Sequence, residues 1–140
     1  MSGRCFLDTN IFIYSFDQAN PDKAAIAKKL IQDRLRSRSG FISFQVIQEF
    51  FNVALKRMPA FVSSPDAELY LLSVLRPLLG VNSSIGLYSE GLRLQRRYKL
   101  SWYDSLIVAA ANEAGCELLY SEDLRDGACF ERIVVKNPFR

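Results

Sequence analysis

The sequence contains no histidine, and this absence excludes several kinds of active site. Ser-His-Asp and Cys-His nucleophiles, a histidine general base and His-ligated zinc all depend on that side chain. The three cysteines, Cys5, Cys116 and Cys129, are odd in number and lack CxxC spacing, and the first two fall in expected strands. We therefore expect core thiols in a reducing compartment. If the protein is an enzyme, we expect carboxylates to be its catalytic groups.

Long apolar runs are also missing. No run approaches the ~18 residues of a membrane span, and no apolar segment follows Met1 as it does in a signal peptide. We therefore expect a cytoplasmic protein with no membrane partner. The 140 residues, 49% hydrophobic and 24% charged, predict a single globular domain over 1–140. The net charge of +3 is compatible with a nucleic-acid partner without requiring one.

Strand and helix signals alternate along the chain. This alternation predicts an α/β fold, a three-layer α/β/α sandwich around a mostly parallel sheet. Short apolar segments predict strands at 5–7, 40–42, 78–81, 116–120 and 133–135. Apolar periodicity and helix-start residues predict helices at 11–16, from 21 past 35, and at 44–57, 66–75, 84–98 and 102–114.

Several helix boundaries depend on single residues. Asn20, which precedes Pro21, and Ser43 are expected to cap the helices that follow them. Ser64 is expected to have the same role in the next helix, and Pro77 is expected to end that helix.

Four acids stand at matching places in this pattern. Asp8 follows the first strand and Asp123 follows the fourth. Glu49 lies about two turns into the helix after the second strand, and Asp104 is the third residue of the helix that starts after Ser101. In a parallel sheet the carboxyl ends of the strands and the amino ends of the following helices share one edge. We therefore expect the four acids on the same rim.

Two of these acids also have a structural explanation when each is taken alone. Glu49 borders the apolar stripe of its helix, where an acid usually snorkels to solvent or is salt-bridged, and Asp104 occupies the position at which a capping box places an acid. A further acid, Asp126, is expected to be a turn residue. The shared location on one rim, and no single position, favours a site.

Carboxylates gathered on one rim repel one another. Two unit charges ~4 Å apart repel by about 4 kcal/mol at an effective dielectric constant near 20. Either some of the carboxyls are protonated or a divalent cation neutralises them. Oxygen ligands alone suit a hard ion, Mg²⁺ or Mn²⁺. Such an ion keeps several waters and leaves room for phosphate oxygens of a substrate, and it can generate hydroxide from a bound water.

The helix expected at 84–98 ends in a cluster of cations: Arg93, Arg96, Arg97 and Lys99. The helix dipole favours cations at a helix C-terminus, so structure alone could account for them. The same side chains could equally contact the phosphates of a nucleic acid. The sequence leaves both explanations open.

Four short motifs, taken in order, carry a resemblance to a known family. They are Leu7-Asp8-Thr9-Asn10, Glu49 in an apolar helix, Ser101-Trp102-Tyr103-Asp104 and Tyr120-Ser121-Glu122-Asp123. Together they resemble the PIN-domain ribonucleases, most closely the toxin component of VapBC-type toxin–antitoxin pairs. The resemblance implies a sheet of about five strands in the order 3-2-1-4-5. It also implies Mg²⁺- or Mn²⁺-dependent hydrolysis of RNA to 5′-phosphate and 3′-hydroxyl ends.

The same resemblance implies roles for particular residues and partners. The catalytic and metal-binding quartet becomes Asp8, Glu49, Asp104 and Asp123. Asn10 and Ser121 match polar helpers that orient those acids or their waters. The implied partners are an RNA substrate, a cognate antitoxin protein and a second copy of the chain in a homodimer.

Three other functions fit parts of the sequence. A phosphoryl-transfer enzyme of the haloacid-dehalogenase kind also has an Asp after its first strand, but needs a second Asp where this chain has Asn10. A non-catalytic RNA- or protein-binding PIN module is expected to have lost one of the acids, and all four are present. A housekeeping RNA-processing nuclease is not separated from a toxin by the sequence.

Overall fold

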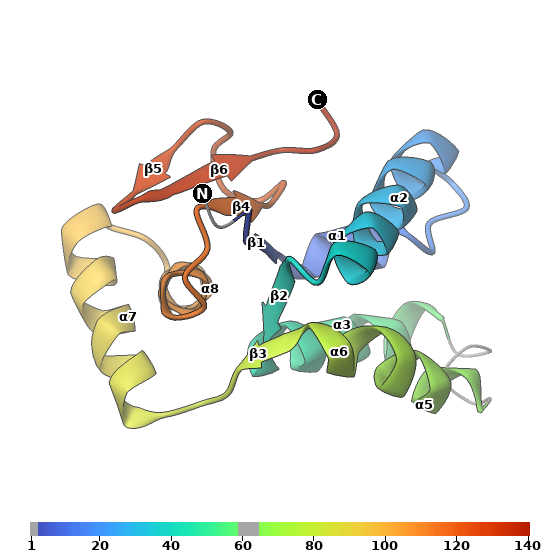
Figure 1. Ribbon diagram of the computed structural model, residues 1–140, viewed down its shortest axis with the longest axis horizontal. Helices are drawn as coiled ribbons and strands as arrows, with labels where there is room; N and C mark the ends of the chain where they lie inside the picture. The colour runs from blue at the N-terminus through green and yellow to red at the C-terminus, as the bar shows by residue number, and fades with distance from the viewer. Residues whose placement is uncertain (1–2, 59–64) are drawn as a thin grey trace.

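The computed structural model, which describes residues 3–58 and 65–140, is built around a six-stranded sheet (Figure 1). Its strand order is β3-β2-β1-β4-β6-β5. Neighbouring strands run parallel, except that β5 is antiparallel to β6. The strands are β1 (Cys5–Leu7), β2 (Gly40–Ser43), β3 (Leu79–Val81), β4 (Leu118–Tyr120), β5 (Cys129–Phe130) and β6 (Ile133–Lys136).

This topology confirms the predicted fold class, and the five predicted strands follow the expected order with β6 in the fifth place. The sequence did not predict β5. This strand is only two residues long and turns into β6 through Glu131, whose φ of 57° lies in the left-handed region. Two residues are too few to show an alternating pattern. The sheet therefore has six strands, and the added one is an antiparallel edge.

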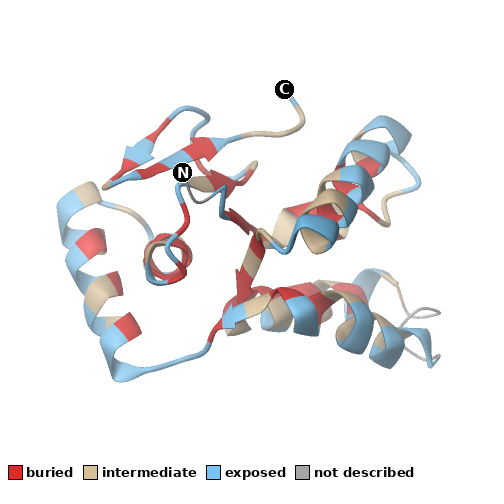
Figure 2. Cartoon of the chain, viewed as in Figure 1, coloured by how far each residue is buried: buried red, intermediate tan, exposed pale blue. Residues whose placement is uncertain are grey.

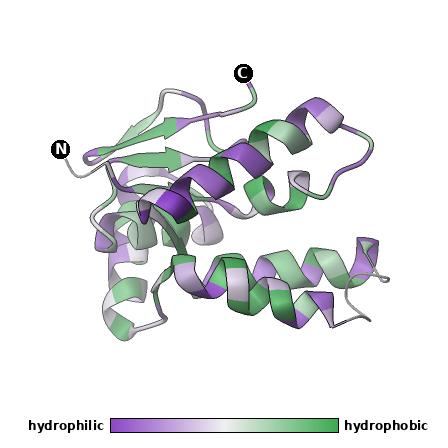
Figure 3. Cartoon of the chain, turned by 45° about the vertical axis from the view of Figure 1, so that its right-hand side comes forward, coloured by the Kyte–Doolittle hydropathy of each residue, from purple (hydrophilic) through white to green (hydrophobic). Residues whose placement is uncertain are grey.

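Helices cover both faces of the sheet, as a three-layer sandwich requires. α7 and α8 lie on one side, and α1, α2, α3 and α6 lie on the other (Figure 1). Hydrophilic segments are most visible on the outer surface of α2 (Figure 3). Within the described residues, none of the helices is both long and apolar enough to cross a membrane. The helical segments are α1 (Thr9–Tyr14), α2 (Pro21–Ser37), α3 (Phe44–Arg57), α5 (Asp66–Tyr70), η1 (Leu71–Leu75), α6 (Arg76–Leu78), α7 (Ile85–Tyr98) and α8 (Trp102–Glu113).

The prediction that Pro77 ends its helix is wrong by one residue, because Pro77 lies within α6 and the helical stretch ends at Leu78. Proline lacks an N–H, and its ring clashes with the carbonyl four residues back in an α-helix. The chain adjusts by forming a π turn, η1, immediately before α6, in which the N–H of Arg76 bonds the carbonyl of Leu71. Ser64, the predicted cap of this helix, lies outside the described residues.

Ser43 and Asn20 stand at the predicted N-cap positions, but neither side chain caps its helix. Asn20 donates instead through Nδ2 to Oδ2 of Asp17 at 2.8 Å. The hydroxyl of Ser43 is buried and has no hydrogen-bond partner in the described part of the chain. By contrast, Ser101 accepts from the N–H of Asp104 at the start of α8. The sequence thus predicts where these helices start, but not which of them has a side-chain cap.

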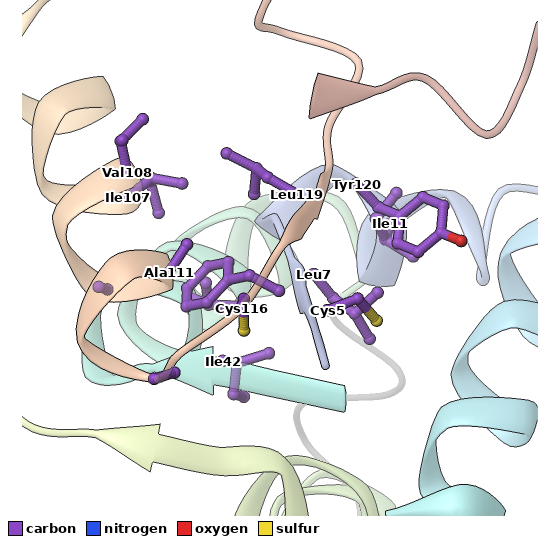
Figure 4. Packing of buried hydrophobic residues seen from close by; sticks show 14 of the residues in the cluster. Cys5, Leu7, Ile11, Ile42, Ile107, Val108, Ala111, Cys116, Leu119 and Tyr120 are labelled. Carbon is purple, nitrogen blue, oxygen red and sulfur yellow. The ribbon is translucent and has the colours of Figure 1, made fainter. Parts of the chain in front are cut away.

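The core fills the space between the sheet and its helices. Buried residues concentrate along the strands and α8 (Figure 2), and Ile107 of α8 joins Leu119 of β4 in the same cluster (Figure 4).

Cys5 and Cys116 are buried, as predicted, whereas Cys129 is exposed. Burial raises the pKa of the Cys5 thiol to about 11 and that of Cys116 to about 12. Both are therefore protonated, unreactive core residues.

Candidate active site

A groove of about 560 Å³ opens at the carboxyl ends of β1 and β4. Its lining residues come from α1 and the segment after it, from α3, from the first half of α8 and from the segment after β4. All four predicted acids line it: Asp8, Glu49, Asp104 and Asp123. The structure therefore brings acids from four separate segments to one groove, as their positions at strand ends and in the first two turns of helices predict.

Asp8 is held at the junction between β1 and α1 and is 4% exposed. Its Oδ1 accepts from the N–H of Thr9 at 2.7 Å, and its Oδ2 accepts from Oγ of Ser121 at 2.8 Å. The pKa of Asp8 is raised to about 7: burial is the largest cause, the two hydrogen bonds oppose it, and the charges of Asp123 and Glu49 add to it. The ionised form of Asp8 is thus one that a cation in the groove would stabilise.

Glu49 reaches the groove from the middle of α3. Oγ1 of Thr9 donates to its Oε1 at 2.7 Å, and Nε2 of Gln45 donates to its Oε2 at 3.3 Å. None of the ion pairs found among the described residues includes Glu49. The salt-bridge explanation for this acid is therefore wrong, and neutral donors orient the carboxylate.

Serine hydroxyls hold the main chain beside the other two acids. The N–H of Asp104 donates to Oγ of Ser101 at 3.2 Å, so this acid contributes its main chain to the helix cap while its carboxylate lines the groove. The N–H of Asp123 donates to Oγ of Ser121 at 3.2 Å. Because the same hydroxyl donates to Asp8, Ser121 ties the first and last acids of the groove together.

Asn10 lines the groove with a side-chain amide that has no partner. Its Oδ1 and Nδ2 are both buried and make no hydrogen bond among the residues that the structure describes. Buried amides without partners are uncommon because they cost free energy. Of the two predicted helpers, Ser121 bonds an acid and Asn10 bonds none. The orphaned amide points to a water or ligand partner in the groove.

The groove also contains residues that the sequence did not single out. Gln45 is buried beside Glu49, and Arg57 lies at the end of α3. Glu122 has its carboxylate bound by the hydroxyl of Tyr14 at 2.6 Å and by Nζ of Lys23 at 2.7 Å. The spacing of four residues between Gln45 and Glu49 was a usable signal, because side chains one helical turn apart are neighbours. No comparable pattern marks Arg57, which resembles any cation at a helix C-terminus.

The four cations for which phosphate contact was left open lie elsewhere, because none of them lines the groove. Arg93 forms ion pairs with Glu90 at 2.6 Å and with Glu131 at 2.8 Å. Three others are exposed near the end of α7: Arg96, Arg97 and Lys99. Among the described residues that line the groove, the one cation is Arg57.

The groove offers the donors that a hard cation uses, namely carboxylate and amide oxygens with no imidazole or thiolate. Within residues 3–58 and 65–140, however, no three Asp, Glu or Cys side chains are grouped so that they could hold a metal ion. The four acids line one groove without forming a ready-made cage. Mg²⁺ is usually bound through one or two carboxylates and keeps several waters. The residues present fit such an ion.

These features define the class of the protein: an α/β domain with a carboxylate-lined groove at the carboxyl edge of a mostly parallel sheet. The family model for the PIN domain matches residues 5–134, and the chain belongs to the PIN domain family. The family resemblance carried by the four motifs is therefore confirmed.

Two solved structures share this fold. A chain of a toxin–antitoxin complex from Klebsiella pneumoniae is 21% identical, with a TM-score of 0.66, over 96% of this chain and 97% of that one. VapC20 of Mycobacterium tuberculosis, described as a sarcin–ricin loop cleaving toxin, is 18% identical, with a TM-score of 0.57, over 84% of this chain and 88% of that one. A comparison with curated protein sequences finds no significant match.

Proposed function

We propose that this protein is a divalent-metal-dependent endoribonuclease and the toxin of a toxin–antitoxin pair. The observation that carries the proposal is the convergence of four carboxylates from separate segments on one groove, with Asp8 buried beside two of the others. Membership of the PIN domain family supports nuclease activity. The descriptions of the two similar structures support RNA as the substrate and a toxin as the role.

In this proposal the four acids, Asp8, Glu49, Asp104 and Asp123, hold the cation and its waters. When bound, Mg²⁺ or Mn²⁺ supplies Lewis-acid stabilisation of the charge that develops on the phosphodiester. Ser121 and the N–H of Thr9 fix the orientation of Asp8. The unpartnered amide of Asn10 hydrogen-bonds the substrate or its attacking water. Cleavage leaves 5′-phosphate and 3′-hydroxyl ends.

Arg57 is proposed to bind a phosphate of the RNA away from the scissile one. It lines the groove and forms no ion pair among the described residues. Because it follows Glu49 by eight residues in the same helix, their Cα atoms are about 12 Å apart. The cations of α7 form a second, outer set of proposed contacts, which Arg93 joins only if its ion pairs open.

The remaining partners are also part of the proposal. We propose that the chain acts as a single domain over 1–140 in the cytoplasm, forms a homodimer and is inhibited by a cognate antitoxin. Co-expression with the product of a neighbouring small reading frame tests the last point. The expected result is a purified complex without nuclease activity.

The direct test of the proposed function is cleavage of RNA with and without Mn²⁺. The wild-type protein should cut RNA in Mn²⁺ and stop when a chelator is added, and Asp8→Asn should be inactive. Asp22→Asn is a matched control, because Asp22 is an exposed acid of α2 outside the groove, and it should cleave like the wild type. Activity that persists in chelator, or in Asp8→Asn, would contradict the metal site.

A further inference from the structure

A continuous chain of hydrogen bonds connects three of the acid-bearing segments of the groove. It runs from the main chain of Asp123 through Ser121 and Asp8 to Thr9 and then to Glu49. Every donor in it is a hydroxyl or a main-chain N–H, so the chain orients the carboxylates without cancelling their charge. The segment that carries Asp104 is not part of it.

Gln45 extends this chain to α8. Its side-chain amide is buried, and Nε2 donates both to Oε2 of Glu49 at 3.3 Å and to the main-chain carbonyl of Tyr103 at 3.2 Å. Tyr103 immediately precedes Asp104 in the first turn of α8. Among the described residues, Gln45 is therefore the side chain whose hydrogen bonds join the turn that carries Asp104 to the other three acids.

Burial alone does not require glutamine at this position. The carbonyl of Tyr103 lies inside an α-helix, where the N–H four residues later is its regular partner. Methionine has nearly the same length and volume and would fill the same space. Unlike methionine, however, glutamine has a side-chain N–H₂ group that can donate to acceptors on both α3 and α8.

We propose that Gln45 is a positioning residue, whose amide sets the separation of Glu49 from Asp104 and thereby how well their oxygens can share one divalent cation. The inference rests on the proposed function, because it concerns the cation that the groove is proposed to bind. When a residue that hydrogen-bonds to a metal ligand is replaced, metal affinity typically falls 10–100-fold.

The first test measures Mn²⁺ binding by isothermal titration calorimetry in Gln45→Met and in the matched control Gln48→Met. Gln48 is on the same helix but is exposed and does not line the groove. We expect affinity to fall about 10-fold or more in Gln45→Met and to stay unchanged in Gln48→Met. In RNA cleavage, kcat should fall while KM stays near the wild-type value. If thermal melting shows Gln45→Met unfolded, Gln45→Asn replaces it, since its shorter amide cannot reach both acceptors.

The second test separates positioning from a purely structural role by combining Gln45→Met with Glu49→Gln. If Gln45 acts through Glu49, its replacement should have no further effect on Mn²⁺ affinity once Glu49 is neutral. Two losses that add in full, or wild-type Mn²⁺ affinity in Gln45→Met, would overturn the proposal. A wild-type protein that neither binds Mn²⁺ nor cleaves RNA would overturn the proposed function itself, before any substitution is compared.

Discussion

Replacing Asp8 with Asn should make the metal-free protein more stable while abolishing its activity. The ionised carboxylate of Asp8 is buried and lies near two other acids, and its pKa is raised from the ordinary value of 3.8 to about 7. At about 1.4 kcal/mol per pKa unit, this difference corresponds to about 4 kcal/mol of destabilisation once the group is ionised. Asn has the shape of the neutral acid and carries no charge, so the substitution removes that penalty.

Part of this gain is lost to hydrogen bonding. Oγ of Ser121 donates to Asp8 and already accepts from the N–H groups of Asp123 and Leu124, so an amide N–H₂ turned toward it has no good acceptor. That mismatch costs about 1–2 kcal/mol, leaving a net gain of about 2–3 kcal/mol. For a chain of this length the gain corresponds to a rise in Tm of roughly 6–10 °C.

The direction of this pKa shift determines how the stability of the wild-type protein changes with pH. Because the pKa of Asp8 is higher in the folded state, the folded protein binds the proton more tightly, and wild-type stability falls as the pH rises from 3.8 through about 7. Thermal melts in chelator at pH 5 and pH 8 should therefore show a larger gap between Asp8→Asn and the wild type at pH 8. A gap that is absent, or equal at both pH values, would refute the argument. Adding Mn²⁺ at 100 times its Kd should stabilise only the wild type, by about 2.7 kcal/mol, and close the gap.

Three other substitutions test separate contacts in the groove. Thr9→Val removes the hydroxyl that bonds Glu49 and should weaken Mn²⁺ binding about 10-fold in calorimetry, whereas Thr9→Ser should restore it; equal affinities would remove this bond from the site. Asn10→Leu should not lower the free energy of unfolding in urea, because the amide makes no hydrogen bond to the described residues, yet should slow RNA cleavage; a loss of stability would mean that the amide is structural. Arg57→Gln, made in the inactive Asp8→Asn protein, should weaken RNA binding in fluorescence anisotropy and lower the log–log salt slope by about 0.7, whereas the neighbouring Lys56→Gln should not; identical slopes would place Arg57 outside the RNA contact.

Three of the four acids could be predicted from the sequence because they stand at element boundaries. Asp8 and Asp123 follow parallel strands, and Asp104 lies in the first turn of a helix, so the topology alone determines which edge of the sheet they reach. Glu49 lies deeper in its helix, and its location depends on the burial of the apolar stripe beside it. These arguments use only the order of the helices and strands and the spacing of apolar residues within each of them.

The groove residues that the sequence did not reveal depend on side-chain geometry between elements. The bond from Gln45 to the carbonyl of Tyr103 exists because α3 and α8 pack at one particular distance, which no pattern within either segment reports. The ion pair between Lys23 and Glu122 joins residues from opposite ends of the chain. The path of the chain through Pro77 escaped prediction for a related reason, since a π turn has no signature in composition.

The partners of the acids separate two roles among them. Glu122 lines the same groove as the four proposed ligands, but a cation, Lys23, and the hydroxyl of Tyr14 occupy both of its oxygens. Asp8 and Glu49 are held instead by neutral donors. A neutral donor fixes the direction of a carboxylate and leaves its charge available, whereas an ammonium cancels the charge that would attract a second cation. A divalent ion should therefore select the acids that are oriented without being neutralised, which is why we assign Glu122 to the structure and not to the metal site.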